Sequence, residues 1–202
     1  MHIELLVEEP SAEAALQILL PKILPGTVSF SIHPHQGKAD LLGSLPQRLE
    51  GYKSWIPPDY RIVVLVDADK GDCRILKRRL DWAALDAGLV TRSRSRSPSF
   101  QVVNRLAVEE LEAWFFGDVE AIAAAYPRVP RNLARKAPFR NPDRIKGGTW
   151  EALERVLQRA GHFPGGLGKI EAARAIARHM DPQRNRSRSF CVFRDALLEI
   201  SS

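Results

Sequence analysis

Residues 62–69 read IVVLVDAD, five apolar residues followed by two aspartates that are one residue apart. A continuous apolar run that is β-branched at most positions predicts a central strand buried on both faces of a sheet. Asp67 and Asp69 then lie at the carboxyl end of this strand, where α/β sheets bind their ligands. Alternate residues of a strand point to the same side, so the two carboxylates repel each other unless a cation neutralises them. Because Mg²⁺ prefers oxygen ligands of this kind, the pattern indicates a metal site.

On either side of this strand, apolar runs alternate with helical patterns. The alternation predicts an α/β fold in which helices flank both faces of a parallel sheet. The predicted strands are residues 3–7, 28–32, 62–66 and 100–104, and the predicted helices are residues 11–20, 38–49, 73–87 and 108–116. Ser11, Asp72 and Asp118 are candidate helix N-caps, and Pro21 and Gly51 are expected to end helices.

The character of the chain changes after Pro127. Residues 128–148 are rich in Arg, Lys, Pro and Asn and predict a loop or an irregular basic arm. Three further helices are predicted at residues 150–160, 169–180 and 190–200. We therefore expect an α/β domain at residues 1–127, with the basic arm and a helical C-terminal extension at residues 128–202 packed on the same domain.

The charge of the chain is uneven along its length. Residues 1–120 carry 14 basic and 17 acidic side chains, whereas residues 121–202 carry 16 basic and 7 acidic ones. An acidic half beside a basic half suits an enzyme that acts on nucleic acid, although a solvated basic surface explains the charge equally well. No apolar stretch approaches the ~18 residues that span a bilayer, and no signal-peptide pattern is seen. We expect a cytoplasmic protein that has no disulfide bond between Cys73 and Cys191.

Acidic side chains follow three of the predicted strands. Glu8 and Glu9 follow the first strand, Asp67 and Asp69 the third, and residues 109–112 (EELE) the fourth. The carboxyl ends of parallel strands share one edge, so these carboxylates can converge there. The alternative is that acidic residues at helix N-termini only complement the helix dipole. That alternative fits the aspartate pair poorly, because both aspartates crowd the end of a buried strand.

These segments resemble the Toprim domain, whose signature is a glutamate after the first strand and an Asp-x-Asp after the third. That domain is shared by topoisomerases, bacterial primases, small ribonucleases and the overcoming-lysogenization-defect nucleases. The chain is more specifically similar to an uncharacterised Toprim-like bacterial family, domain of unknown function 4276. The matching segments are LVEEPSAE (6–13), VDADKGDC (66–73), ELEAWFFGD (110–118) and GGTWE (147–151). The resemblance implies a Toprim-like (Rossmannoid) α/β fold over nearly the whole chain.

The resemblance also implies a catalytic site. Glu8 corresponds to the Toprim glutamate, and Asp67 and Asp69 are expected to hold Mg²⁺ or Mn²⁺. Further acidic residues hold a second metal in the nuclease branch, for which Glu13 and Glu112 are the candidates, and Lys169 is the candidate for an assisting lysine. Glu9 departs from the pattern, because the nuclease glutamate is usually followed by glycine. An extra carboxylate at this position bears on the number of metals and on access of a substrate.

The expected reaction is metal-assisted hydrolysis of a phosphodiester in DNA or RNA. Seven basic residues of the arm are expected to contact backbone phosphates: Arg128, Arg131, Arg135, Lys136, Arg140, Arg144 and Lys146. Phe139 and Trp150 are expected either to stack on bases or to anchor the arm to the core. The nuclease branch implies a separately encoded partner ATPase and host defence against phage. The alternative is a non-catalytic module that binds nucleic acid or a partner protein and keeps the fold for structure.

Overall fold

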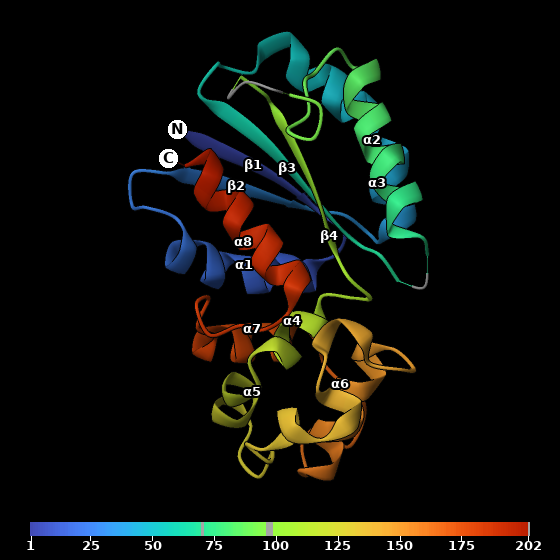
Figure 1. The fold of residues 1–202 in the computed structure, drawn as a ribbon, viewed down its shortest axis with the longest axis vertical. Helices are drawn as coiled ribbons and strands as arrows, with labels where there is room; N and C mark the ends of the chain where they lie inside the picture. The colour runs from blue at the N-terminus through green and yellow to red at the C-terminus, as the bar shows by residue number, and fades with distance from the viewer. Residues whose placement is uncertain (70, 96–98, 202) are drawn as a thin grey trace.

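The computed structural model describes residues 1–69, 71–95 and 99–201. Lys70 of the VDADKGDC segment therefore lies outside the described residues. Within the described part, four strands form one parallel sheet in the order β2-β1-β3-β4. The strands are β1 (His2–Val7), β2 (Ser29–Pro34), β3 (Tyr60–Asp67) and β4 (Val102–Ala107). This arrangement confirms the predicted α/β fold (Figure 1).

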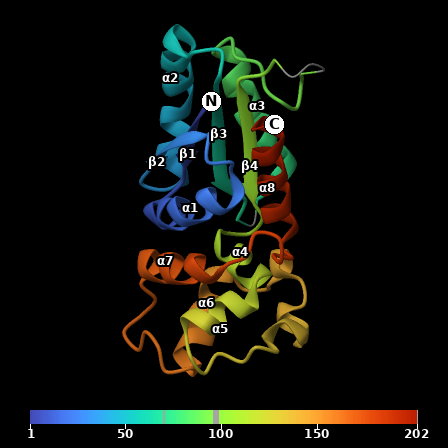
Figure 2. The same cartoon turned by 90° about the vertical axis from the view of Figure 1, so that its left-hand side faces the viewer.

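The central strand β3 is buried on both faces, as its apolar run predicts. Val63 and Leu65 belong to the larger hydrophobic core, whereas Ile62, Val64 and Val66 belong to the smaller one on the opposite face. Helices α2 (Lys38–Trp55) and α3 (Cys73–Asp86) cover the smaller core, while α1 (Pro10–Ile23) and α8 (Arg188–Ile200) cover the other face. Two helical layers thus enclose the sheet (Figures 1 and 2).

The remaining helices form a cap beyond the carboxyl ends of the strands (Figure 2). They are α4 (Glu112–Gly117), α5 (Val119–Ala125), α6 (Thr149–Arg159) and α7 (Lys169–His179). The larger core continues from the sheet face into this cap without a break. Trp114 of α4 is fully buried. Its ring centroid lies 5.2 Å from that of Phe190 and 5.0 Å from that of Phe193, both on α8.

The residues after Pro127 form three short 3₁₀ turns, η1 (Leu133–Arg135), η2 (Ala137–Phe139) and η3 (Pro142–Arg144). This confirms an irregular arm. Val129, Leu133 and Ile145 are buried in the larger core, so apolar anchors along the arm fix a segment whose basic side chains are exposed.

Several helix ends differ from the predictions. Glu9, not Ser11, occupies the N-cap position of α1, and Pro21 lies inside that helix instead of ending it. Helix α2 likewise continues through Pro46 and Gly51 to Trp55. Burial of Ile23, Leu49 and Tyr52 against the cores explains both extensions, because tertiary packing outweighs the local cost of a helix breaker.

Other predicted ends are confirmed. Asp72 caps α3 by accepting a hydrogen bond from the backbone N–H of Arg74, and Asp118 caps α5 by accepting one from the backbone N–H of Ala121.

The two cysteines, Cys73 and Cys191, are free thiols. Among the described helices, none has the length and apolar character that crossing a bilayer requires.

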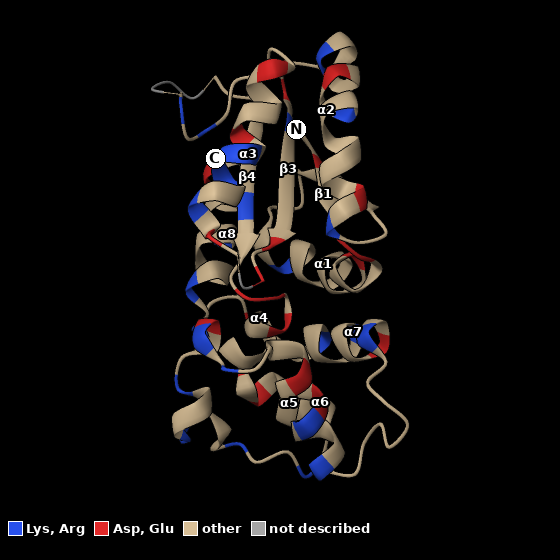
Figure 3. Ribbon diagram, turned by 90° about the vertical axis from the view of Figure 1, so that its right-hand side faces the viewer, with Lys and Arg blue, Asp and Glu red and all other residues tan. Residues whose placement is uncertain are grey.

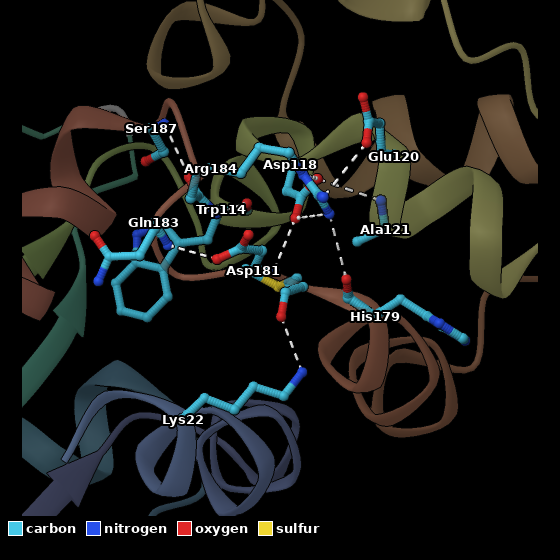
Figure 4. Close-up of polar contacts among 12 residues, drawn as sticks. Lys22, Trp114, Asp118, Glu120, Ala121, His179, Asp181, Gln183, Arg184 and Ser187 are labelled. Atoms are coloured by element: carbon cyan, nitrogen blue, oxygen red, sulfur yellow. Dashed lines mark hydrogen bonds and ion pairs between the residues drawn. The ribbon is translucent and has the colours of Figure 1, made fainter. Parts of the chain in front are cut away.

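Buried Asp118 also joins α5 to the chain before α8. Its carboxylate accepts two hydrogen bonds from Arg184, each 2.9 Å long, and one from the backbone N–H of Asp181 (Figure 4). Nearby, the ammonium of Lys22 in the last turn of α1 donates to the carbonyl oxygens of Ala177, Arg178 and Met180 at 2.8–2.9 Å. These contacts fix the end of α7 against α1.

Candidate functional site

The carboxyl edge of the sheet brings Glu8 and Asp67 together. Val7 pairs with Leu65 in the sheet, so Glu8 lies just beyond β1 and beside the end of β3. The Oε2 atom of Glu8 accepts a hydrogen bond from the backbone N–H of Asp67 at 3.0 Å. Burial raises the pKa of Glu8, and the negative charges of Asp69 and Glu9 raise it further, against the opposing hydrogen bond and Lys38. The two acidic segments that are 59 residues apart in sequence therefore meet.

Asp67 is one of two buried acids at this edge. Only 8% of the residue is exposed. Burial raises the pKa of Asp67 well above its ordinary value, and the negative charges of Glu8, Glu112 and Glu9 add to the effect. A hydrogen bond from the backbone N–H of Leu111 opposes the shift. Nearby negative charge therefore destabilises the ionised form of Asp67 further, after burial has already done so.

Glu112 joins the site from the start of α4. The residue is 2% exposed, and its Oε2 atom has no hydrogen-bond partner among the described residues. Burial raises its pKa to about 7, with smaller contributions of the same sign from Glu110 and Glu9, while Lys169 and the backbone N–H of Glu112 act in the opposite direction. A buried carboxylate oxygen without a partner is costly, which makes it a candidate ligand for a cation.

Asp69 lies on a strained turn just past β3. Its φ is +50°, and that of Glu109 after β4 is +62°. The two residues form an isolated antiparallel bridge, in which the N–H of Asp69 donates to the carbonyl of Glu109 at 2.7 Å. The carboxylate of Asp69 forms an ion pair with Lys38, the first residue of α2. Left-handed backbone at non-glycine residues costs free energy and is concentrated at functional sites.

Lys169, the first residue of α7, supplies positive charge from the cap. Its ammonium lies 3.3 Å from the carboxylate of Glu9. Burial lowers the pKa of Lys169, but the charges of Glu112 and Glu9 outweigh burial and raise it above its ordinary value. The lysine is thus held in its charged form at the rim of the carboxylates.

These side chains make a site with a surplus of negative charge. Among the described residues, the basic side chains close to Glu8, Glu9, Asp67, Asp69 and Glu112 are Lys38 and Lys169. These seven side chains carry a formal charge of −3 when all are ionised. Figure 3 shows acidic segments gathered between the sheet and α4. Within residues 1–69, 71–95 and 99–201, no three His, Cys, Asp or Glu side chains stand in an arrangement that could hold a metal ion. Carboxylate oxygens are the donors that hard divalent cations prefer.

Two acids considered in the sequence are placed differently. Glu13 lies on the first turn of α1 and lines a hollow together with Arg174 and Arg178, whereas the acids that affect Asp67 most are Glu8, Glu112 and Glu9. Glu110 has a structural role. Its Oε2 atom accepts hydrogen bonds from the Thr149 hydroxyl at 3.0 Å and from the Trp150 backbone N–H at 2.8 Å, at the start of α6.

The basic arm exposes all seven of its predicted phosphate contacts: Arg128, Arg131, Arg135, Lys136, Arg140, Arg144 and Lys146. Its aromatic neighbours are engaged within the protein. Phe139 stacks on Phe116 with ring centroids 5.2 Å apart, and the Lys169 ammonium lies 5.6 Å from the ring centroid of Trp150. Both aromatics therefore anchor the arm, which was one of the two expected roles.

Lys38 is the residue of the site that the sequence analysis did not identify. Its position after β2 puts it on the same sheet edge as Asp69, so the rule that grouped the acids could also have found this lysine. The role of Glu9 as the partner of Lys169 had no local signal, because 160 residues separate the two.

Comparison with known proteins identifies the family of the chain. No curated protein and no solved structure matches the chain. A family model described as "Domain of unknown function (DUF4276)" matches residues 7–198, which include every strand end and acidic residue of the site. The chain therefore belongs to the DUF4276 family.

Proposed function

We propose that this protein is a Mg²⁺- or Mn²⁺-dependent phosphodiesterase that cleaves nucleic acid. The observation that carries the proposal is that Glu8 and Glu112 lie close enough to Asp67 for their charges to act on it, and that the pKa values of all three partly or fully buried carboxylates are raised. Burying acids near one another with too little counter-charge destabilises the fold, so such clusters are typical of sites where a cation or a proton transfer is used.

Glu8, Asp67 and Glu112 would hold the cation once their side chains had turned toward it, with Asp69 as a further ligand after release from Lys38. A bound divalent cation lowers the pKa of water and stabilises negative charge on a phosphate. Lys169, kept charged by Glu9 and Glu112, is suited to neutralise a phosphate oxygen next to the cluster. The Glu8 hydrogen bond to the Asp67 backbone keeps the two strand ends in a fixed relation during turnover.

The test is cleavage of plasmid DNA and of RNA in Mg²⁺ or Mn²⁺ by the wild-type protein and by Asp67→Ala. Loss of cleavage in the variant supports the proposal. Asp86→Ala is a matched control, because Asp86 is an exposed aspartate at the far end of α3. The proposal fails if the wild type leaves both substrates intact, or if Asp67→Ala cleaves them as fast as the wild type.

A second candidate function is a non-catalytic module that binds nucleic acid or a partner protein. The observation that favours it is the pairing of Lys38 with Asp69 and of Lys169 with Glu9, because lysines can neutralise such carboxylates in place of a metal. Binding that persists in EDTA and in Asp67→Ala, without any cleavage, supports this alternative.

We also propose that the protein acts with a partner ATPase in defence against phage. This part of the proposal rests on the resemblance to the nuclease branch alone. Co-purification of an ATPase with the tagged protein from its native cells tests the partner. Protection of cells against phage that depends on Asp67 tests the setting.

A further inference from the structure

A groove between α1 and α7 opens beside the carboxylates. Its wider part has a volume of about 840 Å³ and is lined at one end by Glu9 and Lys169, which also border the acidic site. A second hollow of about 480 Å³ continues the groove along the same two helices, and Ile170, Arg174 and Arg178 line both parts. The groove therefore runs from the acidic site along a basic face of α7.

The charges in the groove favour an anion at a distance from the acidic site. Arg174 and Arg178 are exposed, are one helical turn apart, and form no ion pair with any described carboxylate. Glu171 also lines the wider part, but its carboxylate is turned toward Gly168 and Tyr126. Glu13 lines the second hollow on the α1 side. Two guanidinium groups without ion-pair partners on one helix face are suited to bind phosphates.

Ser11 provides an independent sign of a ligand. The residue is 2% exposed, lines the wider part of the groove, and has a hydroxyl oxygen without a hydrogen-bond partner among the described residues. It belongs to the first turn of α1, whose 14 residues begin at Pro10. Helix α7, of 11 residues, also begins at this cavity, at Lys169. The positive dipole ends of two helices thus lie beside the same cavity as a hydroxyl that lacks a partner among the described residues.

The groove is preformed. Lys22 donates three hydrogen bonds from α1 to the last turn of α7 and the residue after it. Figure 4 shows the Lys22 ammonium reaching across from α1. These bonds hold the two helices at one separation before any ligand arrives, which reduces the entropy lost on binding.

We infer that this groove binds the phosphodiester backbone of a nucleic-acid strand and leads it to the acidic site. Arg174 and Arg178 contact phosphates, Ser11 and the helix starts bind the phosphate nearest the carboxylates, and Ile170, which is 45% exposed, contacts a sugar or base. This role rests on the proposed function for its substrate. It differs from the role expected of the basic arm, because Arg131 and Arg135 line a separate hollow beside α5.

The test measures binding of a short fluorescein-labelled single-stranded DNA, and of RNA of the same sequence, by fluorescence anisotropy in EDTA. Asp67→Asn is the background, so that cleavage cannot interfere. The double variant Arg174→Gln/Arg178→Gln is compared with Arg155→Gln/Arg159→Gln, which removes the same charge at the same spacing from exposed positions of α6. We expect the groove variant to weaken binding by at least about tenfold and the control to change it little. The logarithm of the association constant decreases with the logarithm of the salt concentration. The magnitude of this slope should be smaller by about 1.4 in the groove variant, as expected for two lost phosphate contacts on a single strand.

Ser11→Ala separates ligand binding from a structural role. The variant should bind several-fold more weakly while its melting temperature stays equal or rises, because no hydrogen bond is lost from the free protein. A lower melting temperature with unchanged affinity would overturn the role of Ser11. Equal weakening by both arginine pairs, or displacement of the labelled strand by millimolar inorganic phosphate, would overturn the inference that the groove recognises a backbone.

The outcomes also separate this inference from the proposed function. Binding through the groove without cleavage by the wild type leaves the inference standing and removes the hydrolytic activity. If the wild type cleaves nucleic acid and Arg174→Gln/Arg178→Gln cleaves it with the same KM and kcat, the hydrolytic activity is supported and the role of the groove is contradicted.

Discussion

The backbone N–H of Asp67, the last residue of β3, donates a hydrogen bond to the carboxylate of Glu8, just past β1. The nitrogen and the Oε2 atom are 3.0 Å apart. This bond fixes one carboxylate of the site by means of the backbone that carries another. It also leaves the Asp67 side chain buried among negative charges that raise its pKa. The stability of the protein and its response to cations should therefore be coupled at this pair.

Replacing Asp67 with Asn should stabilise the protein in EDTA at pH 8. The substitution removes a buried carboxylate that Glu8, Glu112 and Glu9 destabilise, with an expected gain of about 1 kcal/mol or more and a rise in melting temperature of roughly 2–4 °C. Mn²⁺ should raise the melting temperature of the wild type and leave that of the variant unchanged. Thermal unfolding with and without Mn²⁺ measures both effects, and a variant that is less stable than the wild type in EDTA would contradict the prediction.

The unfolding free energy in EDTA should fall as the pH rises from about 4.5 to about 7. Glu112 ionises near pH 7 in the folded protein but near its ordinary value of 4.5 in the unfolded chain. The unfolded state therefore binds fewer protons across this window, and the stabilising effect of protonated Glu112 is lost as the pH rises through the folded-state pKa. The shift corresponds to roughly 3 kcal/mol for this group, and Glu8 and Asp67 act in the same direction.

Urea unfolding at several pH values between 5 and 8 measures this dependence. Glu112→Gln should flatten the curve and be more stable than the wild type at pH 8. A wild-type stability that stays constant over the window would show that the carboxylate is not held in the buried environment described above.

Replacing Lys169 with Met should strengthen the binding of Mn²⁺ while weakening catalysis. The lysine offsets the charges of Glu9 and Glu112, so its removal leaves more negative charge to attract a cation. We expect the affinity for Mn²⁺ to rise by about tenfold. Cleavage should fall by at least about tenfold, because the charge that faces a phosphate is lost. Calorimetric titration with Mn²⁺ and a cleavage assay provide the two readouts, and Lys169→Arg serves as the control that keeps the charge. Weaker Mn²⁺ binding in Lys169→Met would be inconsistent with this role.

Lys22→Met should destabilise the protein and loosen the groove. The lysine donates to three carbonyl oxygens at the end of α7, and its exposure limits the expected loss to about 1 kcal/mol, or roughly 2–4 °C in melting temperature. Lys136→Met removes an equal charge from an exposed position of the basic arm and should leave stability unchanged. Hydrogen exchange at the backbone amides of α7 should increase in Lys22→Met alone. Equal exchange in both variants would mean that Lys22 does not hold α7.

Much of the sheet could be read from local patterns. The IVVLVDAD stretch predicts a strand buried on both faces because every one of its first five residues is apolar, and β3 places them alternately in the two cores. Parallel pairing follows from the alternation of strands and helices, and it explains why acids after separate strands share one edge. The start of α3 at Asp72 was predictable because a single side chain caps it.

Other features depend on contacts between distant parts of the chain. Pro21 and Pro46 lie within helices because the residues that follow them are buried against a core, and no local pattern records that burial. The pairing of Lys169 with Glu9 requires α7 to pack against α1. The two residues are 160 positions apart in sequence, so no local pattern indicates this contact.

Residue types and their order thus specify which acids reach the sheet edge. Strands and helices alternate along the chain, so all four strands run in the same direction and their carboxyl ends lie at one edge. Their electrostatic state is different. Burial, neighbouring charge and a partner for each oxygen depend on how α4 and α7 close over the strand ends, and that closure exists only in the folded chain. Asp67 and Glu112 are ordinary carboxylates in the sequence, and the packing around them is what raises their pKa values.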